Sequence, residues 1–244
     1  MNNQTSKKGG LPLSPNIITD DSHKTLIIRV QFSRKGTAAF VAHLDMMRIF
    51  ERAMKRADID CEYSQGFNPR PVMAFALPLG VGVETIDDYI DITLQEDIKP
   101  ENFICNLNNS LPEGIEITKA IIIQQTKESM MALVTAAQYL FSSPGISSAI
   151  ESIRNAPALN VTKTHKGETK IIDAKPLIIS AEIQNSDTIN VIVKAGSKEN
   201  LRPDLFLDAL AGTGYFSLED AKNTQIVRTG TFFTAADGKY VRPI

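Results

Sequence analysis

The sequence predicts an α+β protein built from two tandem ferredoxin-like β-α-β-β-α-β halves, each with an antiparallel sheet. Three observations support this fold class. Of the 244 residues, 43% are hydrophobic and 22% are charged, so the chain can bury a substantial core. Strand-like and helix-like patterns alternate in this order over the first half. A similar order then recurs after Gln125, although no residue-by-residue repeat accompanies it.

The first half combines period-2 strands with one strongly amphipathic helix. In residues 43–57 the apolar positions recur every three or four residues and predict a single helix face made of Leu44, Met47, Phe50, Met54 and Ala57. The prolines at 69 and 71 cannot donate to a central ladder, so residues 65–71 must loop out or follow a sheet edge. The predicted strands are 25–32, 61–77 (interrupted), 89–94 and 115–123, and the predicted helices are 43–57 and 100–109.

The second half has weaker patterns of the same kinds. Strands are predicted at 132–141, 171–184, 189–195 and 226–233, and helices at 147–155 and 203–210. The predicted organisation is a disordered leader at 1–24, a ferredoxin-like domain at 25–125 and a second, more divergent one at 126–244. The leader is polar and rich in glycine and proline.

Composition narrows the possible functions. The net charge of −2 gives no global attraction to nucleic acid or to an anionic membrane, so such binding needs a local patch. The longest apolar runs are too short to cross a bilayer, and we expect a cytoplasmic protein without a membrane partner. Cys61 and Cys105 match no metal-ligand spacing, so we expect buried structural thiols, no metal site and no cofactor.

Charge is distributed unevenly along the first half. Residues 29–56 contain seven basic side chains against Asp45 and Glu51, whereas residues 84–101 contain seven acidic ones against Lys99. On the helix at 43–57, Arg48 and Arg52 form a stripe with Lys55 or Arg56, opposite the apolar face. The stripe is either a solvated surface balanced by internal ion pairs or a surface that follows a phosphate backbone.

The segment Tyr63–Pro71 (YSQGFNPRP) carries the best candidates for a binding site. Tyr63 and Phe67 are suited to stacking on a base, Gln65 and Asn68 to bonding its edges, and Arg70 to meeting a phosphate. We therefore predict a binding surface for RNA or for a partner, composed of Arg48, Arg52, Tyr63, Gln65, Phe67, Asn68 and Arg70.

His43 is the single candidate for a catalytic residue. Asp45 lies two positions further on, and helical residues at that spacing do not face each other, so a helix-start role that orients the loop is favoured. No P-loop, dinucleotide fingerprint or Ser–His–Asp order occurs. The pair Gly80 and Gly82 predicts a close approach of two backbones rather than a phosphate cradle.

Three motifs resemble those of the radical SAM-linked family, a domain of unknown function fused to or encoded beside B12-binding radical SAM proteins. They are FVAHLDMMR at 40–48, YSQGFNPRP at 63–71 and FALPLGVGVE at 75–84. The resemblance covers residues 26–123 well. It implies a radical SAM protein as a partner, and genes for ribosome and RNA processing as frequent neighbours. Arg70 stands where the family commonly has a histidine, and the Cys-x-x-x-Cys-x-x-Cys cluster is absent from this sequence.

Several functions are compatible with these features. The first is a non-catalytic accessory module that recognises RNA or presents it to the radical SAM partner. The second is a metal-free ribonuclease resembling the CRISPR repeat-processing enzymes, with His43 as its base. The third is a module that docks on a protein through Phe67 and the prolines. A regulatory site for a small molecule is the fourth.

Overall fold

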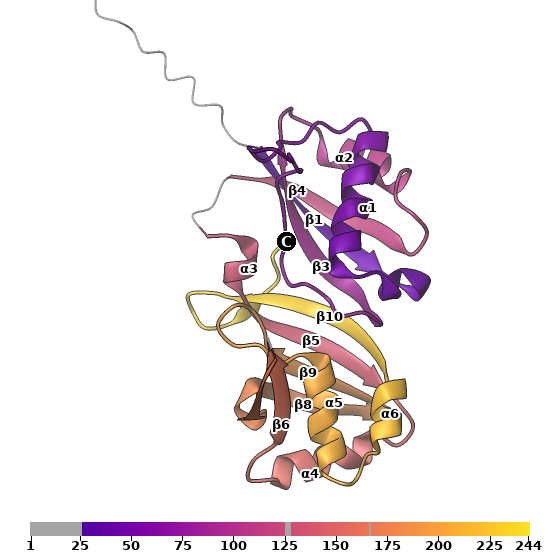
Figure 1. Cartoon of the computed structure of the whole chain (residues 1–244), viewed down its shortest axis with the longest axis vertical. Helices are drawn as coiled ribbons and strands as arrows, with labels where there is room; N and C mark the ends of the chain where they lie inside the picture. Colours follow the sequence, from indigo (N-terminus) through magenta and orange to yellow (C-terminus); the bar gives the residue numbers. More distant parts are fainter. Residues whose placement is uncertain (1–25, 125–127, 166) are drawn as a thin grey trace, which may run out of the picture.

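A single nine-stranded sheet runs through the whole molecule and carries helices from both halves of the chain (Figure 1). The computed structural model describes residues 26–124, 128–165 and 167–244. Its seven-strand path has the order β4-β1-β3-β10-β5-β9-β8, with β2 added on β3 and β11 on β10. All but one of the strand pairs are antiparallel, and six α-helices are present in the described residues. The fold is therefore α+β.

The first half alternates strands and helices as its sequence pattern predicts. Strand β1 pairs with β4 on one side and with β3 on the other, both antiparallel. The helices α1 and α2 follow β1 and β3 along the chain. The elements are β1 (Leu26–Arg34), the 3-10 helix η1 (Gly36–Phe40), α1 (His43–Arg56), β2 (Met73–Phe75), β3 (Val83–Leu94), α2 (Pro100–Asn108) and β4 (Ile115–Ile123).

The second half contains more elements than the sequence predicts. The predicted helix at 147–155 is confirmed, and the strand predicted at 132–141 begins only after a short helix. The elements β6, α3, α6 and β11 have no counterpart in the prediction, and the single strand predicted at 171–184 is divided into the end of β7, η2 and β8. The elements are α3 (Met130–Leu133), β5 (Val134–Ser142), α4 (Ser147–Asn155), β6 (Asn160–His165), β7 (Glu168–Asp173), η2 (Lys175–Leu177), β8 (Ile178–Asn185), β9 (Thr188–Lys194), α5 (Pro203–Gly212), α6 (Leu218–Asn223), β10 (Gln225–Thr234) and β11 (Tyr240–Val241).

The two halves meet along β3. β1 occupies one edge of this strand, and β2 and β10 share the other edge. β2 pairs antiparallel with the Ile90–Ile92 end, while β10 pairs parallel with Val83–Thr85 through Ile226–Arg228. Only three residue pairs therefore join the two parts of the sheet by backbone pairing. The predicted domain limit at residue 125 and the predicted leader both lie outside the described residues.

Each half has its own hydrophobic core. In the first, α1 packs Phe50 against Phe32 of β1 and Phe75 of β2, with ring centroids 5.2 to 5.9 Å apart. In the second, Phe141 of β5 meets Phe206 of α5 at 4.9 Å. Such buried aromatic side chains contribute much of the stability of each half.

The predicted apolar face of α1 is partly wrong. Met46, Phe50, Ala53 and Met54 are the buried residues, whereas Leu44 is exposed. Both sets have helical spacing, so local periodicity alone does not decide between them. The face is therefore rotated toward Met46 and Ala53.

The prediction of two buried cysteines is confirmed for Cys61 and wrong for Cys105, which is exposed on α2. Phe103 and Leu107 form the buried face of α2, so Cys105 lies on the solvent side. Burial also raises the pKa of the Cys61 thiol. In the part of the chain that the structure describes, no helix combines the length and the apolar character needed to span a membrane.

The two thiols should therefore differ sharply in reactivity. In the folded protein an aromatic disulfide reagent at pH 8 should label one cysteine quickly, because the thiolate of Cys105 is accessible and that of Cys61 is neither accessible nor easily formed. Peptide mapping should place the label on Cys105. The variant Cys105→Ser should show no fast phase, and fast labelling of that variant would contradict the burial of Cys61.

Candidate functional site

The segment Tyr63–Pro71 forms a narrow, closed excursion from the edge of the sheet. Tyr63 and Pro71 pair as an isolated antiparallel bridge. The Ser64 amide donates to the Arg70 carbonyl at 2.8 Å, and the Arg70 amide donates to the Ser64 hydroxyl at 3.1 Å. Gly66, with φ of 132°, lets the chain reverse at a backbone conformation that other residues rarely adopt. The prediction that this segment loops out is confirmed.

The base of this excursion, which we call the hairpin, is tied to β3. The Glu62 amide donates to the Thr93 carbonyl, and the Thr93 amide donates to the Val72 carbonyl, at 2.9 and 3.0 Å. The Val72 amide closes the stem by donating to Glu62 at 2.7 Å. The stem is therefore part of the sheet edge, and only its tip extends into solvent.

All the candidate binding residues at the tip are exposed. Phe67 is 105% exposed, so its ring makes essentially no contact with the rest of the protein. Gln65, Asn68 and Arg70 are exposed around it. A fully exposed phenylalanine ring leaves its apolar surface in contact with water, and covering that surface would be favourable, which makes the tip a candidate for contact with another molecule.

The hairpin is connected to the C-terminal end of α1. The ammonium of Lys55 lies 5.9 Å from the centre of the Tyr63 ring. Lys55 also donates to Glu51 at 3.1 Å, and this bond raises the pKa of Lys55, so the lysine stays charged over the ring. The structure therefore brings Tyr63 next to the basic stripe of α1, as the predicted site requires.

The stripe itself is only partly available for a ligand. Arg48 donates to Asp45 at 2.7 Å, and Arg56 donates to the Ser110 carbonyl at 2.6 Å. Arg52 and Arg70 are exposed, and among the described residues neither guanidinium makes an ion pair or a side-chain hydrogen bond. Four carboxylates also occur between residues 48 and 71, against five basic side chains. The surface is thus weakly positive.

His43 lies away from the hairpin. It begins α1, and twelve residues at about 1.5 Å each place it about 18 Å along the axis from Lys55. Its ring packs edge-on against Phe75, with centroids 5.2 Å apart. His43 also borders a small cavity beside Arg34 and Asp88. It therefore belongs to the frame of the first half rather than to the hairpin surface.

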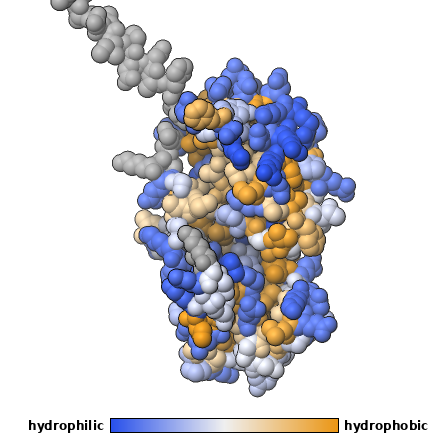
Figure 2. All heavy atoms as spheres, in the orientation of Figure 1, coloured by the Kyte–Doolittle hydropathy of each residue, from blue (hydrophilic) through white to orange (hydrophobic). Residues whose placement is uncertain are grey.

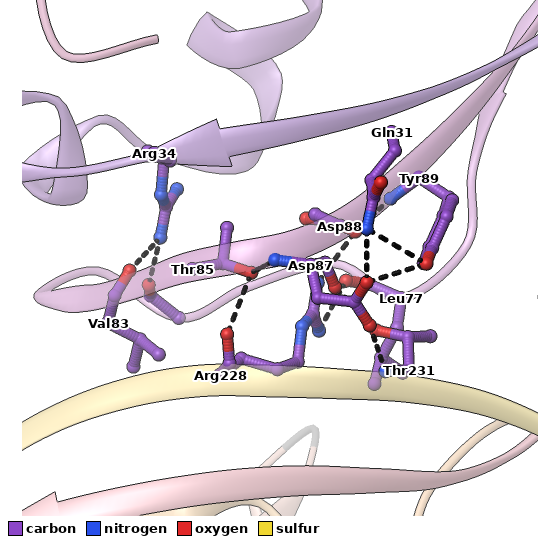
Figure 3. Close-up of polar contacts among 11 residues, drawn as sticks. Gln31, Arg34, Leu77, Val83, Thr85, Asp87, Asp88, Tyr89, Arg228 and Thr231 are labelled. Atoms are coloured by element: carbon purple, nitrogen blue, oxygen red, sulfur yellow. Dashed lines mark hydrogen bonds and ion pairs between the residues drawn. The ribbon is translucent and has the colours of Figure 1, made fainter. Parts of the chain in front are cut away.

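A second polar cluster, which the sequence did not reveal, is buried where β1, β3 and β10 meet (Figure 3). Asp87 and Asp88 are adjacent in β3 and point to opposite faces of the strand. Asp87 accepts hydrogen bonds from Gln31 at 2.5 Å, from the Tyr89 hydroxyl at 2.6 Å and from the Thr231 amide at 2.7 Å. These bonds connect β1 and β3 with β10.

Asp88 forms the charged centre of this cluster with Arg228 of β10. The guanidinium of Arg228 is 0% exposed and lies 2.7 Å from the Asp88 carboxylate. Burial raises the pKa of Asp88, and Arg228 and the Tyr89 amide oppose that rise. Arg228 also donates to the Leu77 carbonyl at 2.9 Å. One buried arginine thus holds β10, β3 and the segment before β3.

Arg34 of β1 fixes the same segment further along. Its guanidinium donates to the carbonyls of Gly80 and Val83 at 2.8 and 2.7 Å, and to Val41 at 3.1 Å. The predicted close approach of two backbones is found at Gly82, whose amide donates to the Ala39 carbonyl at 2.9 Å, although the space for a side chain does not require glycine there. A Cβ on either glycine would meet only side-chain atoms, at 3.8 Å. Gly82 is needed instead for its positive φ of 84°.

Several charged residues in the predicted basic and acidic segments are not on the surface, because they lie buried in strands. Arg29 pairs with Asp91 at 2.8 Å, and both are largely buried, so neither belongs to a basic or acidic face. A usable signal was present nonetheless: two adjacent aspartates in an apolar strand must place at least one carboxylate toward a core. In residues 26–124, 128–165 and 167–244, no three His, Cys, Asp or Glu side chains are arranged to hold a metal ion.

The fold and site define an α+β protein with a nine-stranded sheet, a buried charged seam around Asp88 and Arg228, and an exposed hairpin. Comparison of sequences shows that the chain belongs to the family "Uncharacterized protein conserved in bacteria" (DUF2344), whose model matches residues 28–203. That match includes the hairpin and the segment held by Arg34. A search of curated proteins found no match. An unknown protein from Galdieria sulphuraria, solved by crystallography, is 13% identical, with 83% of this chain and 96% of that chain covered, at a TM-score of 0.25.

The buried pair of Arg228 and Asp88 predicts how variants change the free energy of unfolding. Arg228→Met should lower the free energy of unfolding by about 3–5 kcal/mol, because it leaves the Asp88 carboxylate buried without its partner. The double variant Asp88→Asn/Arg228→Met should be less destabilised than the sum of the two single variants. Urea denaturation measures all three.

The matched control for this series is Arg154→Met. This exposed arginine pairs with Glu151 on α4 and donates to the Ala181 carbonyl of β8 at 3.0 Å, both at the surface, so its loss should change the free energy of unfolding by about 1 kcal/mol. Additive effects of Asp88→Asn and Arg228→Met would show that the pair does not act as a unit.

Proposed function

We propose that this protein is a non-catalytic recognition module that binds single-stranded RNA through the hairpin. The observation that carries the proposal is the complete exposure of Phe67 at the tip of a stem held by the sheet. A rigid stem lowers the entropic cost of binding, because the tip needs little ordering when it meets its ligand.

The types of residue around Phe67 favour RNA. Exposed bases stack on aromatic rings, and amide side chains bond the base edges. Gln65 and Asn68 flank Phe67 on the same turn, and Arg52 and Arg70 supply cations without competing partners among the described residues. A surface for a protein partner does not require this combination of amides and guanidinium groups.

Stacking should supply more of the affinity than charge. Arg48 and Lys55 are paired with carboxylates, so the ligand would gain two free cations, Arg52 and Arg70. For a single strand that neutralises two phosphates, the slope of log K against log salt is about −1.4. The proposed site is therefore selective for unpaired bases and tolerant of moderate salt.

The proposal also includes the relation between the two halves and the partner enzyme. The strand orders β4-β1-β3-β2 and β10-β5-β9-β8 support two ferredoxin-like halves that have merged into one sheet, with the domain limit near residue 125. The sequence resemblance supports a B12-binding radical SAM protein as the enzyme that acts on the bound RNA, in the cytoplasm. His43 would then serve the frame, since it packs on Phe75.

Removing the exposed ring tests the proposal. Phe67→Ala should weaken binding of an unstructured RNA oligomer by about tenfold, since a stacked base contributes about 1–3 kcal/mol. Phe40→Ala is the matched control, because Phe40 is also exposed, at 69%, but lies in η1. Fluorescence anisotropy at two salt concentrations measures both variants.

Equal losses for Phe67→Ala and Phe40→Ala, or an absence of binding by the unaltered protein, would refute the RNA proposal. The salt dependence provides a second measurement. Arg52→Ala should reduce the salt slope by about 0.7, because one ion pair with phosphate is lost. Arg154→Ala, an exposed arginine of the second half, should leave that slope unchanged.

Docking on the radical SAM protein itself is the second candidate function. It is favoured by Pro69 near the tip and Pro71 in the stem, which restrict the backbone on that side of the hairpin and present the Phe67 ring as an anchor for a partner's pocket. If docking is correct, the two proteins should co-purify, and Phe67→Ala should abolish co-purification while the isolated chain shows no affinity for RNA. Co-purification that survives Phe67→Ala would exclude the hairpin as the docking element.

A further inference from the structure

The two outer strands of the main sheet differ in how their free edges are protected. β8 lies at one end of the strand order and β4 at the other, so each pairs along one edge in the described part of the chain. The pairing of β8 is interrupted by two register shifts, and its Ala181 carbonyl accepts a hydrogen bond from Arg154 at 3.0 Å. Irregular pairing and charged side chains are common means by which edge strands avoid other chains. β8 is therefore a protected edge.

β4 is protected differently along its length. The Asn108 side chain of α2 donates to the Ile117 carbonyl at 3.0 Å and accepts from the Ile117 amide at 2.7 Å, so it takes the place of a neighbouring strand there. The end of β4 carries three consecutive isoleucines, at 121–123, and Ile122 is 37% exposed. Figure 2 shows mostly hydrophilic residues at the end of the molecule that carries α1, and this apolar stretch contrasts with them.

The hydrogen-bonding pattern of the sheet indicates which backbone groups of this stretch are free. The amide and carbonyl of Thr93 bond away from β1, to the stem of the hairpin. Its partner in β1, Ile27, therefore bonds in the other direction, to Ile123 of β4. Because successive residues alternate, Ile122 points its amide and carbonyl away from β1, and Ala120 does the same. Among the described residues these four groups have no partner, and an extended strand would satisfy them.

The sequence of this stretch is complementary to itself. In an antiparallel pairing with a two-fold axis at Ile122, this residue faces its own copy. Ile121 then faces Ile123, and none of the residues 120–124 is charged, so no like charges are opposed. Registers centred nearer to the start of β4 would bring the partner's chain against Asn108. Such a pairing closes as a dimer, because the edge of each copy is occupied by the other.

We propose that residues 120–124 of β4 pair with the same residues of a second copy, which joins two sheets across a two-fold axis. The free backbone groups provide the hydrogen bonds, and the isoleucines provide apolar cross-strand contacts. The interface is small, so we expect a reversible dimer with a Kd on the order of 0.1 mM. The hairpin lies beyond β1 and β3 from this edge, so the dimer does not depend on the proposed RNA binding. The dimer would nevertheless present two hairpins on one sheet.

Sedimentation velocity of the full-length protein tests the dimer. Between about 10 µM and about 1 mM, on either side of the expected Kd, the unaltered protein should change from monomer to dimer. Ile122→Lys should stay monomeric, because two ammonium groups would face each other at the axis. Ile183→Lys is the matched control, since Ile183 is 43% exposed on β8, and this variant should dimerise like the unaltered protein.

Opposite charges at position 122 test the register. Ile122→Glu alone should be monomeric, whereas an equimolar mixture of Ile122→Lys and Ile122→Glu should form a heterodimer, because each residue 122 faces the other. The long side chains can reach solvent from this exposed position, so the thermal unfolding of both variants should stay close to that of the unaltered protein. A monomeric unaltered protein at about 1 mM, undiminished dimerisation of Ile122→Lys, or no association in the mixture would overturn the proposal.

Discussion

The buried pair of Arg228 and Asp88 is the interaction on which the arrangement of the two halves depends. Backbone pairing joins β10 to β3 through only three residue pairs, which is a short contact between the two parts of a nine-stranded sheet. The pair places a fully buried guanidinium beside a buried carboxylate at 2.7 Å. A misaligned seam would leave both charges unpaired in an apolar setting, at a cost of several kcal/mol. The network therefore restricts the halves to one alignment.

The same network has consequences beyond the seam. Arg34 and Arg228 both hold the segment Leu77–Val83 through its carbonyls. The backbone of a loop that contains glycine and proline is therefore fixed. The hairpin is organised differently, because its hydrogen bonds end at the stem and its tip contacts little else. The molecule thus combines a frame fixed by buried hydrogen bonds with one projecting element.

A count of charges along the sequence overestimates the charge that the candidate site presents to a ligand. Arg29 and Arg34 were part of the basic excess, yet both are buried in β1, where they bond a carboxylate or backbone carbonyls. The acidic excess is reduced in the same way, since Asp87 and Asp88 are among the most buried polar residues. What remains for a ligand is a small set of cations beside an aromatic tip. Exposure, rather than composition, separates the surface charges from the structural ones.

The sequence by itself determined the local elements and the hairpin. Periodicity predicted α1 and β4 almost to the residue, because a single face of each is buried against one layer. The prolines required residues 65–71 to leave the ladder, since proline has no amide proton to donate. Only the tertiary structure decided which face of α1 is buried, that Cys105 is exposed, and that Asp88 meets Arg228, 140 positions away in the sequence. These outcomes depend on contacts between distant segments, and no local pattern specifies the partner of a buried charge.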